Sequence, residues 1–197
     1  MLSGTYTVGH GLNVAPSLLI LKGRTFTSNW WVYHASLGSS QYLGLNSTAA
    51  ASSLSWGGSP TSSVFTANNS FFTNGQDYVV YCFAPVAGYS SFGSYTGNGS
   101  ADGPFVYTGF KPRWVMVKIT SSTNSWVIVD SERDTYNVVG QRLRADLSNA
   151  EDTQDAVDFV SNGFKIRSSS ASAWNDSGQT YIYAAFAENP FQYARAR

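Results

Sequence analysis

The chain has 197 residues, of which 12% are charged and 15% are aromatic, and its formal net charge is +0. A neutral chain gains little affinity from counterion release on a polyanion, so we expect no nucleic acid partner. Its apolar runs are far shorter than the roughly 20 residues that span a bilayer, and its start lacks the basic and apolar regions of an export signal. We therefore expect a soluble protein that does not insert into membranes. With one cysteine, it can form no internal disulfide.

Short runs rich in Val, Ile, Tyr, Phe and Trp recur along the chain between Gly, Asn, Ser and Pro, which is typical of β-strands. They lie at 17–23, 30–34, 77–83, 92–97, 105–109, 113–119, 125–130 and 180–186. Asn-Gly and Ser-Gly pairs at 74–75, 162–163 and 177–178 predict turns, because glycine adopts positive φ without steric cost. Only 148–161 combines a possible cap, Ser148, with a helical spacing of apolar residues, and we expect one or two helical turns there.

The same segments occur twice and in the same order. Segments 11–23, 29–34, 41–50 and 75–84 match 109–119, 125–130, 141–150 and 178–187. Within them, Lys22 and Trp30 correspond to Lys118 and Trp126. Matched segments at nearly constant spacing indicate an internal repeat of roughly 90 residues.

The repeat and the strand pattern together predict the fold. Short strands separated by turns favour sandwiches or barrels. We expect an all-β protein with little helix, built from two tandem jelly-roll-like β-sandwich repeats at 1–89 and 90–197. The Gly- and Ser-rich stretch 86–104 joins the copies, and the alternation within 92–97 favours a strand there over a flexible linker.

Three stretches carry a resemblance to a known family: HGLNVAPSLLILKGR (10–24), GSYTGNGSADGPFVYTGF (93–110) and YAAFAENPF (183–191). Together with the rest of the chain from about Gly9 to Arg197, they resemble a repeated β-rich module of tailed bacteriophages. That module is found in the C-terminal parts of tail and fibre proteins of marine and environmental phages. The resemblance implies a virion component displayed in several copies. It implies no chemical activity and supplies no residue role.

Residues for nucleophilic catalysis are few. His10 lies in a turn, and His34 ends a strand where the second copy has Asp130, so both are expected to be structural. Cys82 lies in an apolar strand and corresponds to Ala185 in the second copy. We therefore expect it to be a small buried residue. We therefore expect a protein that is not an enzyme.

Carboxylates offer a second route to catalysis, because two acids can hydrolyse a glycosidic bond. Asp130, Glu132 and Asp134 surround Arg133, but the matching segment of the first copy, 34–38, contains no acid. A solvated loop with local ion pairs is the favoured interpretation.

The acidic stretch 151–158 could supply oxygen ligands. Calcium needs six to eight oxygens in a defined loop, and the spacing of an EF-hand is absent. We expect no cofactor and no metal ion, with structural Ca²⁺ as the less favoured alternative.

Glycan binding would use aromatic rings exposed on loops. Trp56 and Trp174 lie outside the strand patterns and are the candidate ligand-binding residues, although packing between subunits is the favoured interpretation of both. Trp30, Trp114 and Trp126 lie in strands and are expected to pack in the core.

These expectations combine into one functional prediction: a non-enzymatic structural protein on the surface of a phage virion, with the tail favoured over the head. It would be a tail fibre or tail-tip component that contributes to attachment to host-surface glycans. The alternatives are a capsid decoration (cement) protein that stabilises the head and, less favoured, a polysaccharide depolymerase. The expected partners are other copies of the chain, in a trimer or another closed oligomer, other virion proteins and a host glycan.

Overall fold

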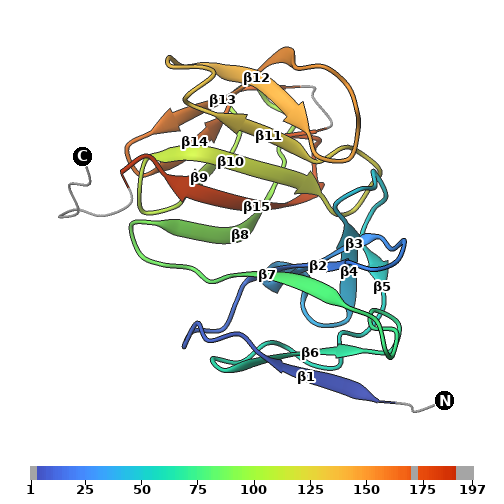
Figure 1. Ribbon diagram of the computed structural model, residues 1–197. Coiled ribbons are helices and arrows are strands. Elements are labelled where there is room, and N and C mark those ends of the chain that lie inside the picture. The colour runs from blue at the N-terminus through green and yellow to red at the C-terminus, as the bar shows by residue number, and fades with distance from the viewer. Residues whose placement is uncertain (1–3, 170–172, 190–197) are drawn as a thin grey trace. The chain divides into compact units, whose positions relative to one another are not determined.

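The structure is a computed structural model that describes residues 4–169 and 173–189, without the side chains of residues 155 and 156 (Figure 1). Strands make up 45% of it and helix 2%, and the strands form several sheets. The helix of the described part is a single 3-10 turn at Ala35–Leu37. The predicted all-β class with little helix is therefore confirmed.

The strands follow one another along the whole described chain. They are β1 (Thr5–Gly9), β2 (Leu18–Gly23), β3 (Trp30–His34), β4 (Gln41–Gly44), β5 (Ser52–Ser53), β6 (Val64–Asn68), β7 (Tyr78–Phe83), β8 (Ser90–Thr96), β9 (Phe105–Tyr107), β10 (Pro112–Ile119), β11 (Val127–Asp130), β12 (Val139–Arg144), β13 (Asp152–Val160), β14 (Gly163–Ile166) and β15 (Thr180–Ala187).

The chain divides into two compact units. Unit 1 comprises the described residues up to Ser47 together with Ala51–Ala84. Unit 2 comprises Thr48–Ala50 and the described residues from Pro85 onward. The division between the long segments thus falls at 84/85, and three residues from within the first repeat belong to the second unit.

Unit 1 contains a five-stranded antiparallel sheet in the order β5-β4-β3-β2-β7 and a separate antiparallel pair of β1 with β6. Successive side chains on a strand point to opposite faces, so Leu19 and Leu21 of β2 share one face. Both are buried with Tyr33 of β3 and Phe65 of β6 in one cluster. This face of the sheet therefore carries the core of unit 1.

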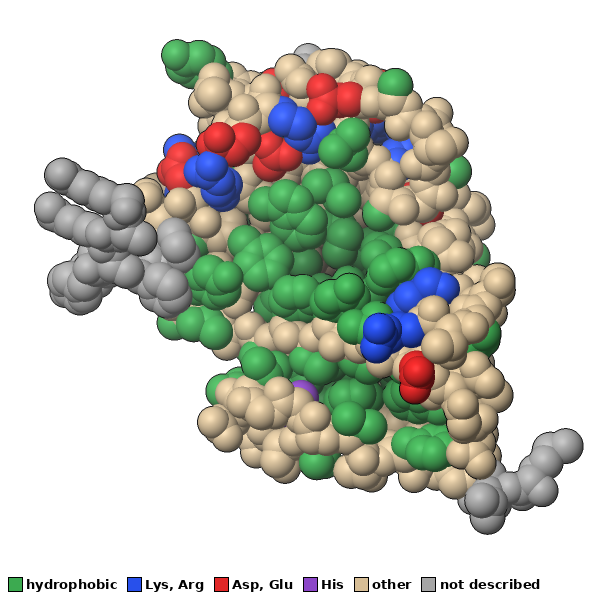
Figure 2. Space-filling view, viewed as in Figure 1, with side chains coloured by type: hydrophobic (Ala, Val, Ile, Leu, Met, Phe, Trp, Pro, Cys, Tyr) green, Lys and Arg blue, Asp and Glu red, His purple; other side chains and the backbone are tan. Residues whose placement is uncertain are grey.

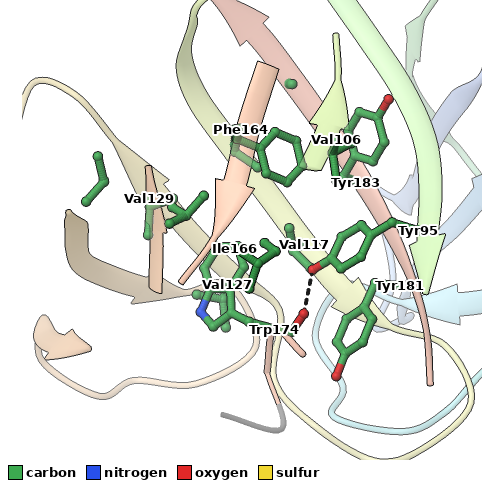
Figure 3. Packing of buried hydrophobic residues seen from close by; sticks show 14 of the residues in the cluster. Tyr95, Val106, Val117, Val127, Val129, Phe164, Ile166, Trp174, Tyr181 and Tyr183 are labelled. Carbon is green, nitrogen blue, oxygen red and sulfur yellow. Dashed lines mark hydrogen bonds between the residues drawn. The ribbon is translucent and has the colours of Figure 1, made fainter. Parts of the chain in front are cut away.

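Unit 2 is built on an eight-stranded antiparallel sheet that is nearly closed into a barrel. Its order is β8-β15-β10-β11-β12-β13-β14-β9. Val115, Val117 and Ile119 alternate along β10 and are fully buried on the inner face. Phe164 of β14 meets Tyr183 of β15 edge to face at 5.4 Å between ring centroids, inside the same cluster (Figure 3).

The sequence repeat reappears as a repeated strand order. In unit 1 the run β7-β2-β3-β4 has the same connectivity as β15-β10-β11-β12 in unit 2. At matched positions, Asn46 Oδ1 accepts the backbone N–H of Trp30 at 3.0 Å, and Asp146 Oδ1 accepts the backbone N–H of Trp126 at 2.9 Å. The duplicated segments therefore preserve local contacts as well as strand order.

The helical turns expected within 148–161 are wrong. Residues 152–160 form β13, which pairs with β12 on one side and β14 on the other. Val157 and Phe159 alternate along it and are buried in the core of unit 2. Backbone pairing with two neighbouring strands outweighs a weak local helical spacing.

Lys118 of β10 is a buried cation. Its side chain is fully buried, and Nζ donates to the carbonyl oxygens of Thr48 at 3.2 Å and Ile119 at 2.8 Å. Burial lowers the pKa of Lys118 to about 8, against the opposing influence of the Asp146 charge. The matching Lys22 of unit 1 is only partly buried and donates to Ser28 O at 2.9 Å.

This lysine should make stability depend on pH. Between pH 8 and 10 the unfolded chain holds a proton that folded Lys118 has released, so the free energy of unfolding should rise with pH. A shift of this size corresponds to about 3 kcal/mol at most. Above pH 10 the effect reverses, because burial raises the pKa of Tyr95 and raises that of Tyr181 to about 12, which keeps both protonated only in the folded state.

Urea unfolding at pH 7, 8, 9 and 10 measures this dependence. We expect Lys118→Met to remove the rise between pH 8 and 10 and Lys22→Met to leave it in place. A rise that persists in Lys118→Met would assign the pH dependence to other groups.

Candidate ligand-binding loop

The two predicted ligand-binding tryptophans are buried, with 1% of Trp56 and none of Trp174 exposed. Trp56 Nε1 donates to Gln41 O at 2.9 Å, and its ring stacks on Phe71 at 4.1 Å. Trp174 is buried in the core of unit 2, in the same cluster as Val127 (Figure 3). The expectation that these residues are exposed on loops is therefore wrong, because both loops fold inward and place the large indole in the core of their own unit.

The acidic segment after β11 forms a loop, residues 131–138, that is held by hydrogen bonds and an ion pair. Asp130 accepts the backbone N–H groups of Glu132 at 3.1 Å and Arg133 at 2.9 Å, and it forms an ion pair with the Arg133 side chain at 2.6 Å. Burial pushes the pKa of Asp130 upward, but the bonds and charge from Arg133 outweigh it, so the pKa lies below its ordinary value. Asp130 is thus an ionised anchor at the start of the loop.

The other acids of the segment also hold the loop. Asp134 Oδ2 accepts the backbone N–H groups of Gly140 at 2.7 Å and Gln141 at 2.6 Å. Glu132 pairs with Arg113 at 2.6 Å on the surface. In Figure 2, acidic and basic side chains lie side by side on the part of unit 2 above its hydrophobic area. Each of these carboxylates thus has a partner within unit 2.

Tyr136 is the most exposed of the large hydrophobic side chains that the structure describes, at 85%. Its neighbour Asn137 fixes the chain on the far side of the loop: Oδ1 accepts Phe159 N–H at 2.9 Å and Nδ2 donates to Phe159 O at 3.0 Å. An exposed aromatic ring between two anchored positions is displayed to solvent at little cost in loop entropy. The sequence pattern of this segment indicated only its acidic residues, and it did not predict that Tyr136 would be exposed.

The remaining nucleophile and base candidates do not form a common site. Cys82 lies opposite Leu19 and His34 lies opposite Leu18, so the two side chains project from opposite faces of the unit 1 sheet. His34 Nδ1 accepts Ser36 N–H at 3.2 Å, and burial raises the pKa of the Cys82 thiol. Among the described residues, no group of three or more His, Cys, Asp or Glu side chains is placed to hold a metal ion.

Sequence reasoning missed a buried asparagine in unit 2. Asn175 is fully buried, and its Oδ1 accepts Asn98 N–H at 2.8 Å. Its Nδ2 lies within hydrogen-bond distance of Asn98 Oδ1 at 3.1 Å, Ser100 O at 2.7 Å and Ser168 O at 2.8 Å. We call this arrangement of Asn98, Ser100, Ser168 and Asn175 the clasp. It orders the Gly-rich 97–103 loop, which belongs to one of the stretches that carry the phage resemblance.

A comparison with protein families gives a match over residues 2–190 to a family described as a domain of unknown function, DUF7483. The chain belongs to the DUF7483 family. No curated protein and no solved structure matches it. Within the described residues of this DUF7483 protein, no helix has the length and apolar character required to cross a membrane.

Proposed function

We propose that this DUF7483 protein is a non-enzymatic structural protein of a phage virion, in a tail fibre or tail tip, that contributes to attachment to host-surface glycans. The observation that carries the proposal is the display of Tyr136 on a loop anchored by Asp130, Asp134 and Asn137. Sugars present C–H faces that stack on exposed aromatic rings, and the ordered loop would meet them with little loss of entropy.

The rest of the chain supports a role in multivalent attachment. With 12% charged residues and a net charge of +0, glycan contacts made by aromatic and hydroxyl groups would depend little on salt. Several copies on one particle, in a trimer or another closed oligomer, would convert weak single contacts into durable attachment through high local concentration.

Tyr136→Ala tests the loop directly. We expect glycan affinity to fall by about tenfold or more, because the variant removes the ring that would stack on the sugar. A tenfold loss corresponds to about 1.4 kcal/mol of binding free energy. The melting temperature should stay unchanged, because the ring is 85% exposed. The measurement is binding of the purified protein to host cells and to a glycan array. Tyr107→Ala, which removes a 67% exposed ring from β9, is the matched control. Equal losses in both variants would argue against a specific role for the loop.

The position in the particle needs a separate test. Immunogold labelling of intact phage with antibody to this chain should place gold on the tail or its fibres. Gold spread evenly over the head would instead favour the capsid decoration alternative. Release of reducing ends from host polysaccharide, lost in Glu132→Gln, would favour the depolymerase.

A further inference from the structure

Two arginines of unit 2 project from the inner face of the barrel. Across the β11–β12 ladder, Arg144 lies opposite Val127 and Arg142 lies opposite Val129. Residues directly opposite in an antiparallel pair point to the same face, and both valines belong to the core. The arginine side chains are only 16% exposed for Arg142 and 14% for Arg144.

Both arginines share one carboxylate. Asp152 accepts Arg142 Nε at 2.7 Å and Arg142 Nη2 at 3.1 Å, and it accepts Arg144 Nη2 at 2.8 Å. The remaining Nη1 of Arg142 donates to Gln154 Oε1. The hydrogen bonds and charges of the two guanidinium groups hold the pKa of Asp152 well below its ordinary value, so Asp152 stays ionised. Two cations and one anion leave this trio with one positive charge.

Arg144 retains donors that no described residue accepts. Only its Nη2 has a hydrogen-bond acceptor among the described residues, although the guanidinium group offers five N–H groups in all. A guanidinium so little exposed to water gains strongly from a charged acceptor placed on its free edge. Asp152 is 42% exposed, so solvent reaches the trio from that side.

The core of unit 2 holds another unpaired donor. Trp174 Nε1 is buried and has no hydrogen-bond acceptor among the described residues. Trp174 belongs to the same buried cluster as Val127, the cross-strand partner of Arg144 (Figure 3).

We propose that Arg144, supported by Arg142, binds the carboxylate of an acidic sugar in a host glycan. The planar guanidinium fork matches a carboxylate through two parallel hydrogen bonds. A single surplus positive charge balances a singly charged carboxylate better than a phosphate carrying up to two charges at neutral pH. This inference rests on the proposed glycan attachment and names its ligand class, at a site separate from the Tyr136 loop.

Calorimetric titration of the full chain with glucuronate, glucose and inorganic phosphate tests it. We expect glucuronate to bind, glucose to bind at least about tenfold more weakly, and phosphate to compete poorly. Arg144→Gln should reduce glucuronate affinity by about tenfold or more. Arg144→Lys keeps the positive charge but lacks the planar guanidinium group, so this variant should also lose most of the glucuronate affinity. Arg167→Gln is the control, because this 43% exposed arginine already pairs with Asp158 at 2.5 Å.

Four results would each overturn the inference: no saturable glucuronate binding, equal binding of glucose, stronger binding of phosphate, or unchanged affinity in both Arg144 variants. Circular dichroism and melting temperature show whether Arg144→Gln folds. If it does not fold, the glucuronate affinity of Arg144→Lys tests the inference. The titration uses a free monosaccharide and does not depend on where the protein sits in a virion. Gold on the head would thus defeat the tail assignment alone, and failed titration would leave the Tyr136 result standing.

Discussion

Replacing Asn175 with alanine should lower the free energy of unfolding of unit 2 by about 3 to 5 kcal/mol. The change removes the acceptor of Asn98 N–H and the donor shared by Ser100 O and Ser168 O. Asn175 is fully buried, so water cannot replace these bonds without opening the loop. Each buried polar group left unpaired costs about 1 to 3 kcal/mol.

Asn175→Asp gives a sharper version of the same test. It keeps the shape of the side chain but places an oxygen where Nδ2 now meets three acceptor oxygens, and we expect a loss at least as large. Hydrogen exchange of the β10 and β15 amides under increasing urea reports on unit 2, and exchange of the β2 and β3 amides reports on unit 1, where the control residue lies. Asn46→Ala is the control, since this exposed side chain accepts only one backbone N–H, from Trp30, and should cost about 1 kcal/mol or less. Similar losses for Asn175→Ala and Asn46→Ala would show that the clasp contributes little.

Trp56→Ala should destabilise unit 1 by about 3 to 5 kcal/mol, the range for removing a large buried aromatic side chain. The indole is 99% buried and stacks on Phe71 at 4.1 Å between ring centroids. It also satisfies Gln41 O through Nε1. The variant would leave a cavity and an unpaired carbonyl together.

Exchange of the β2 and β3 amides measures the stability of unit 1 in this variant. Trp30→Ala, at a partly exposed ring in the same sheet, is the matched control and should cost less. The two roles considered for Trp56 give opposite results. A variant as stable as the wild type that nevertheless loses glycan binding would restore the role of Trp56 as a ligand contact.

Local patterns located eight of the fifteen strands of the described chain, because β-branched and aromatic runs ending at Gly or Asn have few alternative structures. The duplication could also be recognised from the sequence. The matched segments form the strands of two runs with the same connectivity, β7-β2-β3-β4 and β15-β10-β11-β12. Burial of loop residues was not visible. Whether Trp56 or Trp174 faces water depends on how a loop folds over the core, and their flanking Ser, Gly and Asn residues fit either outcome.

Two further features depended on long-range contacts. The clasp joins Asn98 to Asn175, which lie 77 residues apart in the sequence. The residues that flank each asparagine do not indicate that the two are in contact. In β12, alternation would place Leu143 inside and its arginine neighbours outside. The structure has the opposite arrangement, with Leu143 40% exposed and Arg142 and Arg144 on the inner face. Pairing register decides which face is inner, and a shift of one residue exchanges the faces.

The place of Thr48 limits how far the two copies are modular. Thr48 O accepts Asn124 N–H at 2.9 Å and Lys118 Nζ at 3.2 Å, yet Thr48 is encoded in the middle of the first copy. A fragment that starts at Pro85 would lack this acceptor and leave a buried ammonium group with one fewer hydrogen bond. Dissection into separately expressed halves should therefore give a second half of reduced stability, unless residues 48–50 are supplied to it as a peptide or a graft. The second copy of the sequence thus depends on three residues that lie within the first.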